Sequence, residues 1–286
     1  MSFVQDCEDV NSISLTALRN LMTKNGVDPR SVGRLEVGTE TLLDKAKSMK
    51  TILMSLFKES GNHDIEGVTS INACYGSTNA IFNTLNWIDS TSWDGRYGIV
   101  ISSDIAVYPK GNARATGGAG AIAFLIGPNA PIAFEPIRAT YIDNAFDFFK
   151  PNPSKFFTLH GVNADNVNDL LVSEYPTVNG HHSMQVYMKA MKQCYTTLRE
   201  KFAARYGIND LNLSDFSYFA FHTPFSKMIQ KSFLALILAD IEVNYAEVKL
   251  DETKRRYEQA MMEELAVKKF VNDAATLSLL LKKFGN

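Results

Sequence analysis

The chain has 286 residues, of which 45% are hydrophobic and 21% charged, and its formal net charge is −2. This balance is typical of a soluble globular protein, and without a basic excess we expect no nucleic-acid partner. The N-terminus lacks the basic start and apolar stretch of a signal peptide, and the apolar run FLALILAD is too short to cross a bilayer. Three cysteines, Cys7, Cys74 and Cys194, are too few for a disulfide framework, so we expect a cytoplasmic protein without membrane contact.

The first half alternates helix and strand patterns. Residues 8–26 have apolar side chains at helical spacing and Gly26 as a stop signal, which predicts an amphipathic helix. The next expected elements are a strand in 31–40, a helix in 42–61, a strand, turn and helix in 68–87, and buried strands at 97–107 and 119–127. Strands alternating with helices favour an α/β layered fold.

The second half is more helical. Residues 152–171 are polar and aperiodic and predict an extra surface loop. A helix follows, with a packing stripe of Met184, Met188, Met191, Tyr195, Leu198 and Phe202. Residues 216–221 predict a strand that ends at His222 and leads into another helix, and residues 250–286 predict a charged helix and a last strand. We therefore divide the chain into 1–150, an insertion at 151–172, and 173–286.

Two side chains stand where a strand ends and a helix begins, Cys74 and His222. A helix N-terminus is expected to lower the pKa of a cysteine and favour its thiolate, so Cys74 is a candidate nucleophile. Facing each other, these two half-sites would form a Cys–His site. The structural alternatives are a small buried cysteine and a histidine that binds neighbouring backbone.

Five long runs of the sequence resemble eukaryotic-type 3-hydroxy-3-methylglutaryl-CoA synthases of the thiolase superfamily. They are RLEVGTET, NACYGSTNAIFNTLNWIDSTSWDGRYG, SDIAVYPKGNARATGGAGAIAFLIGPNAPI, SEYPTVNGHHSMQ and FHTPFSKMIQKS. The resemblance implies a thiolase-like layered αβαβα fold. It implies condensation of acetyl-CoA with acetoacetyl-CoA through an acetyl-cysteine, on the mevalonate route. It further implies a homodimer of the folded chain, with no metal and no cofactor besides the CoA thioester substrates.

The resemblance also implies residue roles. Cys74 matches the nucleophile, Glu40 the general acid/base, and His222 the histidine that polarises the second thioester substrate. Asp104 matches a structural acid near the site. The implied substrate-binding residues are Asn112, Thr116, Ser183, Lys227, Lys231 and Asn286.

Each role has a structural alternative. Glu40 could cap a helix, Ser183 could be an N-cap, and Asn112 and Thr116 could be turn residues. Lys227 and Lys231 could form a solvated helix face.

The sequence also departs from the family pattern. Ser77 replaces the usual glycine and is expected to crowd the turn. Relative to the family, an N-terminal strand segment and the C-terminal strands are missing, and the 152–171 loop is extra. A second hypothesis is therefore a catalytically weak or inactive truncated paralogue or fragment. A third is another acyltransferase of the thiolase superfamily, which the VGTE sequence around Glu40 disfavours.

Overall fold

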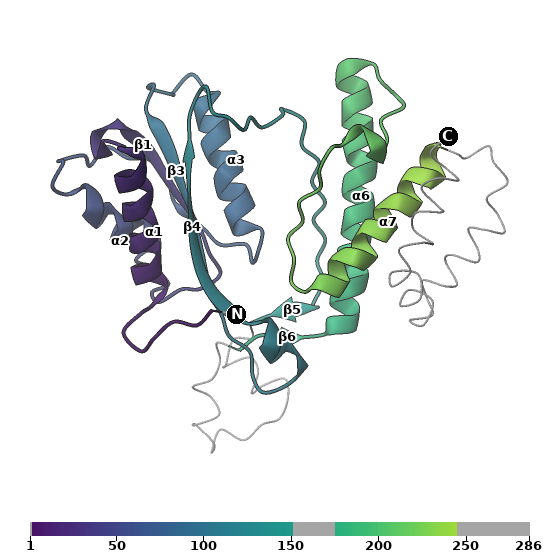
Figure 1. The fold of residues 1–286 in the computed structure, drawn as a ribbon, viewed down its shortest axis with the longest axis horizontal. Helices are drawn as coiled ribbons and strands as arrows, with labels where there is room; N and C mark the ends of the chain where they lie inside the picture. The colour runs from purple at the N-terminus through teal and green to yellow at the C-terminus, as the bar shows by residue number, and fades with distance from the viewer. Residues whose placement is uncertain (1, 151–174, 245–286) are drawn as a thin grey trace. The chain divides into compact units, whose positions relative to one another are not determined.

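The computed structural model describes residues 2–150 and 175–244. The chain divides into two compact units, Met1–Ala133 and Phe134–Asn286, and each is described by itself (Figure 1). The division at residues 150 and 172 stays a prediction. In the part of the chain that the structure describes, no helix combines the length and apolarity needed to traverse a bilayer.

The first unit is built on a four-stranded sheet with the strand order β2-β1-β3-β4. β1 (Val32–Gly38) pairs in parallel with β2 (Thr69–Ser70) and β3 (Tyr97–Ala106), and β4 (Gly118–Ile126) pairs antiparallel with β3. The strands expected in residues 31–40, 97–107 and 119–127 are thus confirmed. The strand before Cys74, β2, is only two residues long.

Helices cover both faces of this sheet (Figure 1). α1 (Val10–Asn25) begins with a capping box at Asp9 and ends at Gly26, whose φ of 60° is the left-handed conformation expected of a C-terminal glycine. α3 (Gly76–Ile88) lies on the opposite face. Successive residues of β3 show this division, since the Ser103 hydroxyl contacts α1 and the Ser102 hydroxyl contacts α3.

The helix expected over residues 42–61 is wrong in extent. The structure has α2 (Met49–Leu53), a 3₁₀ turn at Met54–Phe57, and irregular chain before them. The Asp44 carboxylate accepts hydrogen bonds from the backbone N–H groups of Ala46 and Lys47, both at 2.7 Å. This local side-chain capping offers the backbone an alternative to the helix.

The core of the first unit lies between the sheet, α1 and α2. Its largest fully buried apolar side chains are Phe57, Leu18, Leu35, Leu53, Ile99 and Ile101. On the α3 side the sheet instead carries a buried ion pair, in which Arg34 lies 2.6 Å from the fully buried Glu36. The Arg34 guanidinium also lies 5.9 Å from the centroid of the Trp87 ring of α3.

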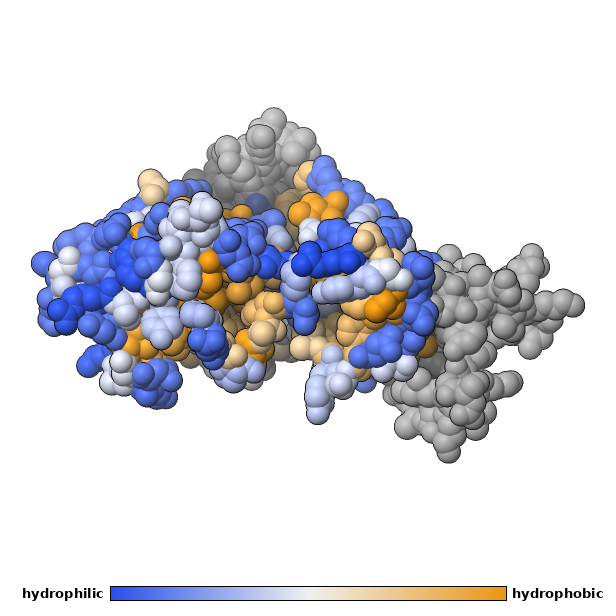
Figure 2. Space-filling view, turned by 90° about the horizontal axis from the view of Figure 1, so that it is seen from above, coloured by the Kyte–Doolittle hydropathy of each residue, from blue (hydrophilic) through white to orange (hydrophobic). Residues whose placement is uncertain are grey.

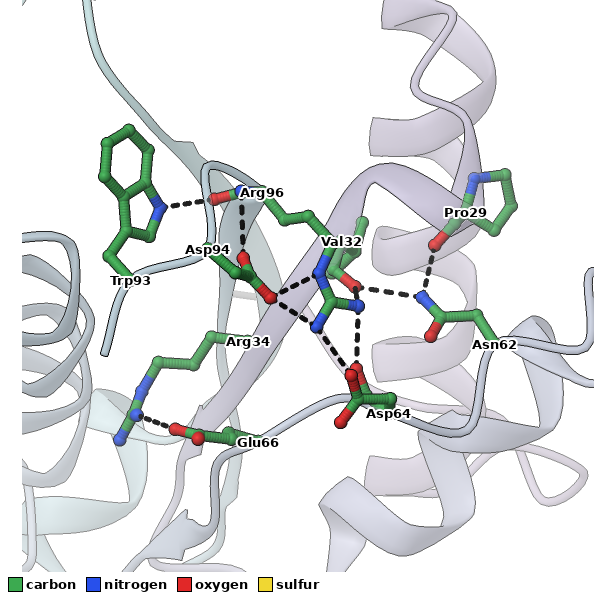
Figure 3. A network of polar contacts seen from close by, with 9 residues as sticks. All are labelled: Pro29, Val32, Arg34, Asn62, Asp64, Glu66, Trp93, Asp94 and Arg96. Carbon is green, nitrogen blue, oxygen red and sulfur yellow. Dashed lines mark hydrogen bonds and ion pairs between the residues drawn. The ribbon is translucent and has the colours of Figure 1, made fainter. Parts of the chain in front are cut away.

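A polar network joins the loops at the end of the sheet where β1 begins (Figure 3). The Arg96 guanidinium binds the carboxylates of Asp94 and Asp64 and donates to the backbone carbonyl of Val32. The Asn62 side-chain amide donates to the carbonyls of Pro29 and Val32, each at 2.9 Å. These contacts hold the N-terminal end of β1 in place, whereas the candidate site lies at its C-terminal end.

The strand β4 is less buried than its apolar sequence predicts. Ile122 is 60% exposed and Phe124 38% exposed, and both lie on the face of the sheet that α3 covers elsewhere. Exposed apolar side chains are also visible among hydrophilic ones in the space-filling view (Figure 2).

In the described part of the second unit the main elements are two packed helices, α6 (Gly180–Tyr206) and α7 (Ser226–Asn244). Two-residue strands, β5 (Phe148–Phe149) and β6 (Thr177–Val178), pair antiparallel beside them. The expected Met-rich helix is thus confirmed as α6.

A buried polar cluster ties the two long helices together. Asp240 of α7 accepts hydrogen bonds from the Tyr195 hydroxyl and the Arg199 guanidinium of α6, and from the Leu213 backbone N–H. Burial of the Tyr195 hydroxyl, and then its hydrogen bond to the Asp240 carboxylate, raise the pKa of Tyr195. The cluster holds the helices in one register.

The strand expected at residues 216–221 is wrong, because this segment is irregular. The Phe219 ring packs against Phe233 of α7, with centroids 5.2 Å apart, and Phe221 packs on the same helix residue at 6.0 Å. Among the described residues no strand lies beside this segment to pair with it, and Phe219 and Phe221 pack on α7 instead, while Tyr218 is exposed.

Three further expectations lie outside the described residues. They are the insertion at 151–172, the helix and strand at 250–286, and the role of Asn286.

Candidate active site

The candidate nucleophile lies on a tight turn between β2 and α3. Ala73, just before Cys74, has a φ of 43°, which is uncommon for a residue with a side chain. The turn packs against the backbone, since a Cβ on Gly76 would lie 2.9 Å from the Ser70 carbonyl oxygen. Cys74 is exposed at this turn, two residues before Gly76, the first residue of α3.

The Cys74 thiol donates a hydrogen bond to the Glu40 carboxylate, with Sγ and Oε1 3.2 Å apart. The two residues are 34 positions apart in the sequence. They meet because Glu40 follows β1, Cys74 follows β2, and these neighbouring strands run parallel, so both exits lie at one edge of the sheet. The structure therefore brings together the first two residues expected in the site.

Asp104 of β3 holds the Glu40 segment. Its Oδ1 accepts the Glu40 backbone N–H at 2.7 Å and the hydroxyls of Thr39 at 3.1 Å and Thr41 at 3.0 Å. The Thr41 hydroxyl oxygen in turn accepts the Ile105 backbone N–H at 3.0 Å. Hydrogen bonds to a charged acceptor are among the stronger ones, so this arrangement fixes the peptide that carries the base.

The electrostatics of the pair differ from the expectation that the helix start lowers the Cys74 pKa. Desolvation of the thiol, the negative charge of Glu40 and the hydrogen bond to it, and the more distant Asp104 raise the pKa of Cys74 to about 12. These effects outweigh the N-terminus of α3, and that expectation was wrong. Cys74 is therefore a neutral thiol at rest, with Glu40 placed to receive its proton.

Tyr108 is a neighbour of the pair that the sequence reasoning did not single out. Burial and then the negative charge of Glu40 raise the pKa of its hydroxyl, which also interacts with the side chain of Thr116. In the sequence, only its position could have pointed to it: Tyr108 lies four residues after Asp104 and two residues after the end of β3.

The two candidate substrate-binding residues of the first unit follow β3. Asn112 and Thr116 bound a short 3₁₀ helix and are both exposed. The Thr116 hydroxyl donates to the Ala113 carbonyl at 2.6 Å, as expected of a turn residue, while its contact with Tyr108 links the turn to the neighbourhood of Cys74.

The remaining candidates belong to the second unit. His222 is exposed, and its backbone carbonyl accepts the Tyr187 hydroxyl at 2.8 Å. Lys227 and Lys231 lie on the first turns of α7, four positions apart and thus on one helix face; Lys227 is exposed and Lys231 half-buried.

Ser183 lies in the first turn of α6, and its hydroxyl donates to the Asp147 carboxylate at 2.8 Å. The alternative reading of Ser183 as an N-cap is wrong, because the Asn179 side chain caps α6 by accepting the His182 N–H.

Within residues 2–150 and 175–244, no three His, Cys, Asp or Glu side chains cluster in a way that could bind a metal ion.

Comparison with known proteins adds independent findings. The family model "Hydroxymethylglutaryl-coenzyme A synthase N terminal" matches residues 1–131, and the corresponding C-terminal model matches residues 132–282. Hydroxymethylglutaryl-CoA synthases of Homo sapiens, cytoplasmic and mitochondrial, are 48% and 49% identical to the chain over 245 residues. Those alignments cover 84% of this chain and 44% and 45% of the human proteins.

A solved structure, MvaS in complex with 3-hydroxy-3-methylglutaryl coenzyme A, has a similar fold. It superposes with a TM-score of 0.73 at 26% identity, over 95% of this chain and 58% of that one. The chain thus spans about half the length of the curated relatives that it matches. Because the two family models together match nearly its whole length, the chain belongs to the hydroxymethylglutaryl-CoA synthase family.

Proposed function

We propose that this chain carries the acyl-transfer site of a hydroxymethylglutaryl-CoA synthase, which condenses acetyl-CoA with acetoacetyl-CoA. The observation that supports this most is the hydrogen bond from the Cys74 thiol to Glu40 at 3.2 Å, with Asp104 holding the Glu40 peptide. A nucleophile within reach of a base, and a base oriented by a third group, is the arrangement that covalent catalysis requires.

In the first step the Cys74 thiol transfers its proton to Glu40, and the sulfur attacks the thioester carbonyl of acetyl-CoA. The carbon–sulfur bond to CoA breaks, the CoA sulfur leaves with a proton, and acetyl-Cys74 remains. One thioester is exchanged for another, so the step is close to balanced in free energy. The high pKa of Cys74 makes the proton transfer to Glu40 the demanding part.

In the second step the Glu40 carboxylate removes a proton from the acetyl methyl group. The resulting enolate carbon adds to the ketone of acetoacetyl-CoA, His222 donates a hydrogen bond to the alkoxide that forms, and the alkoxide takes up a proton from solvent to become the 3-hydroxyl group. Water then cleaves the thioester to Cys74 and releases 3-hydroxy-3-methylglutaryl-CoA. In this proposal Lys227 and Lys231 bind CoA phosphates, and Asn112, Thr116, Ser183 and Asn286 contact the acyl-CoA substrates.

We further propose that the protein is a homodimer in the cytoplasm, on the mevalonate route, with CoA thioesters as substrates and no cofactor. The few cysteines and the cytoplasmic relatives support the location. The domain division 1–150, 151–172 and 173–286 belongs to the same proposal.

A second candidate is a chain of weak or no steady-state activity. It is favoured by the exposed apolar face at Ile122 and Phe124. A protein of small net stability loses cooperative folding when it leaves apolar surface and strand edges uncovered.

The proposal is tested by incubating the purified chain with labelled acetyl-CoA, followed by peptide mass spectrometry. We expect the acetyl group on Cys74 and none on Cys7 or Cys194, and no label in Cys74→Ser. Label on Cys194 alone would remove Cys74 from the nucleophile role. Cooperatively unfolding protein without label would contradict the proposed function, and protein that neither unfolds cooperatively nor takes up label would favour the second candidate.

A further inference from the structure

Ser77, where the family usually has glycine, does not crowd the nucleophile turn. Its hydroxyl lies 2.6 Å from the Ser102 hydroxyl of β3, and it reaches the Gly38 carbonyl of β1 at 3.4 Å. The expected steric conflict was therefore wrong, because the side chain has space and a hydrogen-bond partner.

The Ser77–Ser102 pair lies where three elements of the site meet. Gly38 ends β1, two residues before Glu40, and a Cβ on it would fall 2.3 Å from the Ser77 Cα, so the backbones of β1 and α3 are in direct contact. Ser77 is three residues after Cys74, and Ser102 is two residues before Asp104.

We propose that the Ser77–Ser102 hydroxyl pair sets the separation between Cys74 and Glu40 by fixing the first turn of α3 to β3. Both residues are positioning residues, since neither touches the reacting atoms. The catalytic consequence rests on the proposed function, but the positioning itself concerns only the geometry of the thiol and the carboxylate.

The charged and titratable groups around the Cys74 thiol come from every neighbouring element. They are Glu40 after β1, Asp104 in β3 and Tyr108 after β3. Among the described side chains, Glu40 accepts a hydrogen bond from the thiol, and its charge also raises the pKa of Cys74, so a change in the Cys74–Glu40 distance is expected to change the reactivity of Cys74.

The experiment measures the rate of alkylation of Cys74 by iodoacetamide as a function of pH, read by peptide mass spectrometry, with exposed Cys7 in the same molecule as the reference. In Ser77→Ala and Ser102→Ala we expect the Cys74 profile to shift to lower pH and its rate near pH 8 to rise several-fold. The double variant should equal either single variant, because removal of one hydroxyl already breaks the pair.

Ser92→Ala is the matched control, since it removes one member of the exposed Ser90–Ser92 hydroxyl pair, which is 2.8 Å apart. Ser102→Thr keeps a hydroxyl and should keep the parent profile. Ser77→Gly, the family-like variant, should behave as Ser77→Ala and replaces it if the alanine variant fails to unfold cooperatively.

An unchanged pH dependence of Cys74 alkylation in folded Ser77→Ala and Ser77→Gly would overturn the proposal. If the melting temperature falls while that pH dependence stays unchanged, the hydroxyl pair only stabilises the fold and does not position Cys74. Alkylation needs no acetyl-CoA, so failure of acetyl transfer would sink the proposed function and leave this test readable.

Discussion

The two units support their candidate residues in different ways. In the first unit the Cys74 thiol and the Glu40 carboxylate lie 3.2 Å apart at the exits of neighbouring strands, and a third strand holds the base through Asp104. In the second unit His222 lies on an irregular segment and Lys227 on the first turn of a helix, both exposed. Two parallel strands thus bring two candidate residues into contact within one unit, whereas the described part of the second unit carries His222 and Lys227 on separate elements.

The largest expected effect tests whether the first unit holds the chemistry. Glu40→Gln should lower condensation by about 10²- to 10⁴-fold, because the carboxylate that removes the methyl proton is lost. Acetyl transfer to Cys74 should slow but continue, because the substitution removes the proposed acceptor of the thiol proton and also one of the charges that raise the thiol's pKa.

Condensation and acetyl-Cys74 are measured separately, by product release and by peptide mass spectrometry. Glu36→Gln serves as the control. Glu36 lies in β1, the strand that leads to Glu40, and its carboxylate pairs with Arg34 and does not lie at the thiol. Condensation by Glu40→Gln at the parent rate would leave Glu40 a purely structural residue.

A matched pair of aspartates sharpens the comparison between the units. Asp104→Ala and Asp240→Ala each remove a carboxylate that accepts three hydrogen bonds, so each should destabilise the protein by about 2 kcal/mol. Only Asp104→Ala should also change the alkylation rate of Cys74, because only Asp104 holds the Glu40 peptide. Denaturant unfolding and alkylation, run on both variants, check this, and an equal change in reactivity would contradict it.

The smallest expected effect concerns an exposed ion pair of the second unit. Lys189 lies 2.7 Å from Asp143, and the hydrogen bonds from Lys189 and Tyr141 lower the pKa of Asp143 to about 2. A depressed carboxyl pKa stabilises the fold above the ordinary value of 3.8, and this contribution is lost as the pH falls through about 2.

Lys189→Ala should therefore lower the melting temperature slightly at pH 7, and the difference from the parent should vanish toward pH 2. Thermal unfolding over that range checks the sign. A difference that grows on acidification would contradict it.

Much of the fold could be predicted from local pattern. The helix from Val10, the strands at Val32 and Tyr97 and the Met-rich helix all carry their periodicity, caps and stop residues within a few positions of one another. The position of Cys74 between a strand and a helix is equally local. Such features need no knowledge of distant neighbours.

The misses depend on neighbours far away in the sequence. The high pKa of Cys74 depends on a carboxylate 34 residues earlier, which the position at a helix start does not reveal. The strand expected at residues 216–221 is rich in aromatic residues, but a strand forms only beside a partner, and its rings pack on α7 instead. The roles of Tyr108 and of the Ser77–Ser102 pair could not be predicted from the sequence, because their contacts depend on how β1, β3 and α3 pack in the fold.

The most direct test of the account is a single-turnover chase of acetyl-Cys74. The chain is acetylated with labelled acetyl-CoA, freed of excess substrate and mixed with acetoacetyl-CoA, and the label is followed from protein to product. If Cys74 and Glu40 form an acyl-transfer pair, the label leaves Cys74 and appears in 3-hydroxy-3-methylglutaryl-CoA, and in Glu40→Gln it stays on the protein. Label that reaches only acetate, at the same rate with and without acetoacetyl-CoA, would contradict the account.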